Sequence, residues 1–115
     1  MANLRLEDVD YEVVDFFYNT ASPVIFCNLA VGDLILEARV TITTPFDDAA
    51  AMVSIGPTSN PDSLLATNET KPTVASDYIT ERSFKAAGSD SVTLKIVPGT
   101  STQGAGRAVV ICRRA

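Results

Sequence analysis

The chain has 115 residues, of which 46% are hydrophobic and 20% charged, and its formal net charge is −5. A chain of this length corresponds to one domain, and its apolar content excludes a disordered protein. The acidic balance argues against general affinity for nucleic acid, which depends on Lys and Arg side chains that neutralise phosphates. No run of about 20 apolar residues is present to span a membrane.

Residues 1–10 alternate weakly and are expected to form an N-terminal arm or an edge strand, ahead of a domain that spans residues 11–115. The next segment, residues 11–18, reads Y-E-V-V-D-F-F-Y and favours a strand because it is rich in β-branched and aromatic side chains. One face of such a strand can enter the core, which leaves apolar side chains on the other face. We therefore predict a subunit interface formed by Tyr11, Val13, Phe16, Phe17 and Tyr18.

The two ends of the chain carry opposite charge. Acidic residues gather near the N-terminus and arginines near the C-terminus. Two interpretations remain open: both segments are simply solvated, or they attract one another within a subunit or between neighbouring subunits. The candidate charged contacts are Glu7, Asp8, Asp10, Arg113 and Arg114.

A short strand is expected at residues 24–27, and residues 33–46 show a strict two-residue alternation. Apolar side chains occupy one face of this long strand and polar ones the other, which predicts one buried and one wet face. The apolar positions are Leu34, Leu36, Ala38, Val40 and Ile42. Pro45 ends the pairing because it cannot donate a backbone hydrogen bond.

Residues 50–55 form the next expected strand, followed by one short helical turn near residues 61–66. Asn60 is a good N-cap and Pro61 suits the first position of a helix. Leu64 and Leu65 would then close one end of the core.

Three further strands are expected at residues 77–84, 91–97 and 108–112, with Val92, Leu94 and Ile96 on one face of the second. Strands at intervals of about a dozen residues, separated by Gly, Pro and Asn turns, are typical of sandwiches and barrels. The sequence therefore predicts an all-β chain folded as a single antiparallel β-sandwich, either jelly-roll-like or immunoglobulin-like.

No combination of residues indicates catalysis. The chain has no histidine, so a Ser or Cys nucleophile lacks its usual base and a zinc site lacks ligands. We expect Asp47 and Asp48 to form a solvated turn, and residues 98–106 to be a flexible connection rather than a phosphate-binding loop, because the Gly-Lys-Ser/Thr ending is missing. Cys27 and Cys112 lie in apolar strands and are expected to be free, buried thiols. The chain is thus predicted to be no enzyme and to have no cofactor and no metal.

Several segments together resemble small β-sandwich structural proteins of tailed bacteriophage virions. They are A-R-V-T-I-T-T-P-F-D-D at residues 38–48, V-S-I-G at 53–56, N-P-D-S-L-L at 60–65, Asp77-Tyr78, and the Gly-rich run that leads into the last strand. The resemblance covers residues 33–112, and the N-terminal third has no counterpart in it.

The resemblance implies a virion structural protein that carries no catalytic residues. The first expectation is a phage capsid decoration (cement) protein that binds the assembled shell as a homo-oligomer, commonly a homotrimer, with the major capsid protein or another virion protein as its partner. The alternatives are a head-fibre, tail-fibre or tail-tip module that recognises a host surface, or a carbohydrate-binding β-sandwich. No secretory signal is recognised, so the expected location is the virion after synthesis in the host cytoplasm, with no nucleic-acid or membrane partner.

Overall fold

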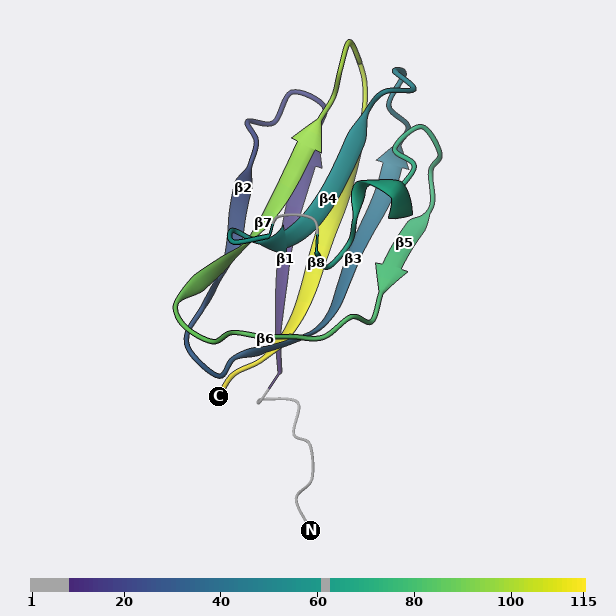
Figure 1. The fold of residues 1–115 in the computed structure, drawn as a ribbon. Helices are drawn as coiled ribbons and strands as arrows, with labels where there is room; N and C mark the ends of the chain where they lie inside the picture. Colours follow the sequence, from purple (N-terminus) through teal and green to yellow (C-terminus); the bar gives the residue numbers. More distant parts are fainter. Residues whose placement is uncertain (1–8, 61–62) are drawn as a thin grey trace.

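The computed structural model describes residues 9–60 and 63–115, which form two antiparallel sheets packed face to face (Figure 1). The larger sheet has the strand order β1-β8-β3-β5, with β6 pairing the start of β3, and the smaller sheet has the order β2-β7-β4. The elements are β1 (Val9–Phe17), β2 (Val24–Leu29), β3 (Leu34–Thr44), β4 (Met52–Pro57), the 3₁₀ turn η2 (Thr67–Glu69), β5 (Asp77–Thr80), β6 (Phe84–Lys85), β7 (Asp90–Val97) and β8 (Ala105–Arg113).

The strands pair in a nested order that identifies the topology. The first strand pairs the last, β2 pairs β7, and β3 pairs β6, so each pair encloses the next along the chain. Folding a chain double in this way and winding it into two sheets produces a jelly roll. The predicted antiparallel sandwich is confirmed, and of the two topologies left open it is the jelly roll.

The expected strand at residues 77–84 is interrupted, and the structure replaces it with β5 and β6. Between them the Arg82 side chain turns to the segment before η2. Its Nη2 donates to Glu69 Oε2 at 2.7 Å, and its Nη1 donates to the carbonyl oxygen of Leu64 at 3.2 Å. These contacts hold residues 81–83 away from the ladder with β3.

The helical turn expected near residues 61–66 is displaced. Pro61 and Asp62 lie outside the described residues, and residues 63–66 are not helical; the turn is instead η2 at Thr67–Glu69. Leu65 and Ile55 exchange two backbone hydrogen bonds of 2.9 Å. The N–H and C=O groups of Leu65 therefore have partners in an extended conformation and need no helical hydrogen bonds. Leu64 and Leu65 are each 1% exposed, which confirms their predicted place in the core.

The pairing of the long strand β3 with β8 shifts register at two points, and the second lies between Ile42 and Thr44 at the end of the strand. The first shift lies between Ile35 and Glu37, where Leu36 is the additional residue of a β-bulge. A bulge reverses the faces of the residues that precede it. Ile35 is therefore buried, whereas Leu34 and Leu36, which were predicted to face inward, are only partly buried. The prediction is confirmed for Ala38, Val40 and Ile42.

The core is tightly packed beside the paired strands β1 and β8. Phe16 is fully buried and lies opposite Gly106 in the β1–β8 ladder. A Cβ atom at Gly106 would lie 2.7 Å from Cζ of Phe16 and 2.4 Å from the backbone oxygen of Thr41. The missing side chain of Gly106 therefore leaves the space that the aromatic ring fills.

Candidate interaction surface

The outward face of the larger sheet brings apolar side chains from several strands together. In the β1–β8 ladder, Tyr11 lies opposite Ile111 and Val13 opposite Val109. The ladders of β8 with β3 and of β3 with β5 place Ile79 in the same row as Val109. We call this set, together with the other outward aromatic residue of β1, the outer patch: Tyr11, Val13, Phe17, Ile79, Val109 and Ile111.

The outer patch is open to solvent in the single chain. Tyr11 is 60% exposed, Phe17 56%, Val13 52% and Ile79 49%. The Asp15–Arg107 pair separates Phe17 from Val13, and Arg39 lies between Val109 and Ile79. Exposed apolar side chains gathered on one sheet face favour a contact with another molecule. Its position on β1, an edge strand of the larger sheet, makes it accessible from the side as well as from above.

The structure separates the residues that were predicted to form the interface. Tyr11, Val13 and Phe17 point outward, whereas Phe16 is completely buried in the core of its own domain. Tyr18 is half-buried and packs against the core. Phe16 therefore has no surface to offer a neighbouring subunit, and Phe17 is the aromatic residue of the pair that does.

Two ion pairs lie within and beside the outer patch. Arg107 Nε donates to Asp15 Oδ1 at 2.7 Å, and Arg39 Nη2 lies 3.1 Å from an oxygen of Glu37. The hydrogen bond from Arg107 and its positive charge hold the pKa of Asp15 below its usual range. A molecule that covered this face would therefore cover these two ion pairs.

A shallow hollow of about 440 Å³ lies at the Phe17 end of this face. Its titratable lining residues, Asp15 and Arg107, pair with one another. The outward side chains around it are Asp15, Phe17, Thr41, Thr43, Ala105 and Arg107. The hollow is therefore lined by apolar side chains and by one ion pair.

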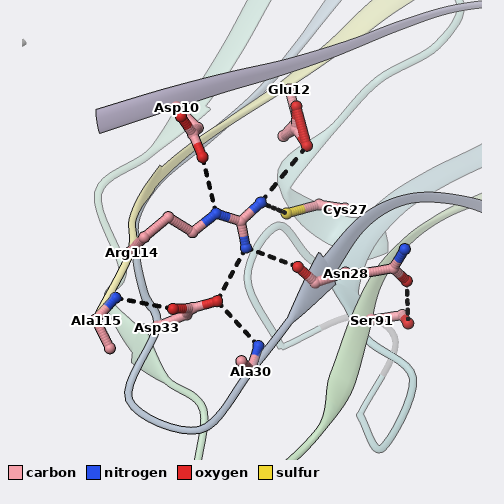
Figure 2. A network of polar contacts seen from close by, with 9 residues as sticks. All are labelled: Asp10, Glu12, Cys27, Asn28, Ala30, Asp33, Ser91, Arg114 and Ala115. Atoms are coloured by element: carbon pink, nitrogen blue, oxygen red, sulfur yellow. Dashed lines mark hydrogen bonds and ion pairs between the residues drawn. The ribbon is translucent and has the colours of Figure 1, made fainter. Parts of the chain in front are cut away.

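A second cluster of polar groups closes the end of the sandwich where β1 begins and β8 ends (Figure 2). The Arg114 guanidinium donates to Asp10 Oδ2 at 2.8 Å, to Asp33 Oδ2 at 2.9 Å and to the carbonyl oxygen of Asn28 at 2.7 Å. Glu12 lies 3.7 Å away. One side chain thus ties together β1, β2, the β2–β3 turn and the end of β8.

Asp33 is the buried member of this cluster, only 4% exposed. The backbone N–H groups of Ala115 and Ala30 and the guanidinium of Arg114 donate to it, and these bonds hold the pKa of Asp33 below its usual range. Sequence reasoning did not identify Asp33. The signal available was a lone carboxylate between Gly32 and an apolar strand, where burial requires hydrogen-bond partners.

The structure pairs part of the predicted charged set within one subunit. Asp10 and Arg114 form an ion pair, whereas Arg113 is exposed at the end of β8, opposite Val9. Glu7 and Asp8 lie outside the described residues.

The Asp47-Asp48 pair has a structural role in the loop between β3 and β4. Asp48 Oδ2 accepts the N–H of Thr100 at 2.7 Å, and Asp47 Oδ1 accepts the N–H of Thr102 at 2.7 Å. The loop between β7 and β8, expected to be a flexible connection, is therefore fastened to the β3–β4 loop. The N–H of Ala50, followed by the N–H and hydroxyl of Thr100, lowers the pKa of Asp48, and the hydroxyl and then the N–H of Thr102 lower the pKa of Asp47.

Within residues 9–60 and 63–115, no three His, Cys, Asp or Glu side chains are grouped so that they would hold a metal ion. In the same part of the chain, no helix is long and apolar enough to cross a membrane.

No protein-family model matches the chain, and no curated protein matches its sequence. Solved structures do share its fold. A chain in the acidic stable capsid structure of Helicobacter pylori bacteriophage KHP30 superposes with a TM-score of 0.70 at 11% identity, covering 91% of this chain and 86% of the other. A chain in the capsid asymmetric unit of cyanophage Pam1 gives a TM-score of 0.64 at 21% identity, covering 93% of this chain and 84% of the other. Both comparisons establish a shared fold across nearly the whole domain.

Proposed function

We propose that this protein is a non-enzymatic structural component of a phage virion, and specifically a decoration protein that binds the assembled capsid shell as a homo-oligomer. The observation that carries the proposal is the shared fold with chains from two phage capsid structures, each matched over more than nine-tenths of this chain. The outer patch supports it, because a protein that works by assembly needs an exposed contact surface.

Sedimentation with undecorated capsids tests the proposed role directly. Purified protein should pellet with the shells at a stoichiometry of many copies per particle, and should raise the temperature at which the shells disassemble. A fibre or tail-tip module would occur at only a few copies per virion. Protein that stays in the supernatant and leaves shell stability unchanged would contradict the decoration role.

Replacing Phe17 by glutamate should dissociate the homo-oligomer. The substitution places a charge in the outer patch, where a buried aromatic anchor contributes about 2 kcal/mol or more to association. Subunit affinity should therefore fall by roughly 30-fold or more. Light scattering across a concentration series measures the change, and the trimer implied by the resemblance is the expected state of the unmutated protein.

The matched control is Ile25→Glu, because Ile25 is 61% exposed and lies on β2 of the smaller sheet, away from the outer patch. It introduces the same charge on a strand and should leave the oligomer intact. An unmutated protein that is monomeric at micromolar concentration, or an oligomer that Phe17→Glu leaves unchanged, would exclude the outer patch as the subunit contact.

A further inference from the structure

The two cysteines lie in one region of the core but on different sheets. Cys27 belongs to β2 of the smaller sheet and is 2% exposed, and Cys112 belongs to β8 of the larger sheet and is fully buried. Both are free thiols, as the sequence predicted. No part of the proposed function uses either of them.

The sheets approach one another beside these cysteines. Cys27 comes just before the end of β2, and a short turn carries the chain from there to Asp33 and the start of β3 in the other sheet. In that sheet Cys112 is the ladder partner of Ile35, close to the same turn. The two cysteines therefore flank the place where the chain crosses between the sheets.

The Arg114 side chain provides a second link between the two positions. Arg114 comes two residues after Cys112, just beyond the end of β8. Its Nη2 lies 3.9 Å from Cys27 Sγ, and its Nη1 donates to the carbonyl oxygen of Asn28 (Figure 2). The Arg114 side chain thus spans from the end of β8 to β2. Both thiols belong to the same buried core cluster, and burial raises the pKa of each. The neighbouring Cys112 adds to the effect of burial on Cys27, whose pKa rises to about 11.

We propose that Cys27 and Cys112 are a dithiol that closes to an intramolecular disulfide linking the two sheets when the protein meets an oxidising environment. The oxidant is a small disulfide of the glutathione class. The thiolate of one cysteine attacks a sulfur of that disulfide and releases one small thiol, and the thiolate of the other then attacks the mixed disulfide and releases the second. The protein loses two protons and two electrons, and the small disulfide is reduced to two thiols.

Burial sets the rate of this step. The protonated, enclosed thiols react slowly while the domain is closed, because the thiolate is the nucleophile. Oxidation therefore proceeds when the end of the edge strand β2 opens. Under the proposed function, a protein made in a reducing cytosol and released with the virion would be synthesised as the dithiol and cross-linked later.

The test incubates purified, unmutated protein with oxidised glutathione and follows its intact mass, its reaction with a thiol label under denaturing conditions, and its melting temperature. The cross-link should lower the monomer mass by about 2 Da and block labelling of both cysteines. It should raise the melting temperature by about 10 °C or more, because it closes a loop that spans most of the chain. Dithiothreitol should reverse all three changes.

The single variants Cys27→Ala and Cys112→Ala are the controls, and neither should show the mass loss or the rise in melting temperature. Three outcomes would overturn the inference: a mass that stays unchanged after prolonged oxidation, a stable glutathione adduct on one cysteine, or a disulfide-linked dimer. Since the test uses the chain without capsids, its result is independent of whether the protein binds a shell.

Discussion

Replacing Phe16 by alanine should lower the free energy of unfolding by about 3–5 kcal/mol. Phe16 is fully buried and its ring fills the space over Gly106, so its removal leaves a cavity that the adjacent backbone cannot close. A loss of that size is a large part of the stability of an ordinary domain, which is about 5–15 kcal/mol in total. Equilibrium unfolding in urea, followed by circular dichroism, measures the change.

Phe17→Ala is the matched control, because the neighbouring residue has the same side chain on the opposite face and is 56% exposed. At a protein concentration at which the chain is monomeric, its unfolding free energy should change by no more than about 0.5 kcal/mol, since Phe17 is exposed in the single chain. The two variants thus separate stability from assembly. A similar loss of stability in both would show that the faces of β1 are assigned incorrectly.

Replacing Arg114 by methionine should lower the unfolding free energy by about 2–3 kcal/mol, because it leaves the carboxylate of Asp33 buried with its guanidinium partner removed. The Arg114 side chain is itself 36% exposed, which places the loss below that of a fully enclosed ion pair. Arg107→Met is the matched control, because it makes the same substitution in β8 of the larger sheet. Its ion pair with Asp15 is exposed, so this variant should unfold like the unmutated protein.

The effect of Arg114→Met should also depend on pH. The pKa of Asp33 in the folded protein lies below its ordinary value of 3.8, so the ionised carboxylate adds stability above about pH 4, and that stability is lost as the pH falls through the folded pKa. Once Asp33 is protonated, the guanidinium of Arg114 loses its ion pair with that carboxylate. The difference in unfolding free energy between the unmutated protein and Arg114→Met should therefore narrow from pH 6 towards pH 2. A difference that stays constant would show that the ion pair with Asp33 is not the source of the stability that Arg114 provides.

Local alternation made much of the fold predictable. The inward faces of β7 and of most of β3 follow from a period of two, because that period is a property of the strand itself. The bulge at Leu36 has no such local signature: it arises where β3 meets β8, a strand far along the chain. For the same reason the sequence left the faces of Phe16 and Phe17 undecided, since both residues are apolar and only the register with Gly106 assigns them.

The contacts that sequence reasoning missed join residues that are distant in the chain. Asp47 and Asp48 looked like an isolated turn, and their partners Thr100 and Thr102 looked like a flexible loop. Neither segment contains a sequence pattern that predicts contact with the other. The role of Asp33 could not be predicted for the same reason, because its partner Arg114 lies after the last strand, far along the chain.

The nested pairing of the strands has a consequence for how the domain is made. The last strand, β8, lies between β1 and β3 in the larger sheet and pairs with both. Neither β1 nor β3 can therefore form its ladder with β8 until β8 has been synthesised. A ribosome therefore releases β1 and β3 long before the strand that joins them. Because such long-range pairing must first overcome the entropy of loop closure, we expect the domain to fold slowly, and only after β8 has emerged from the ribosome.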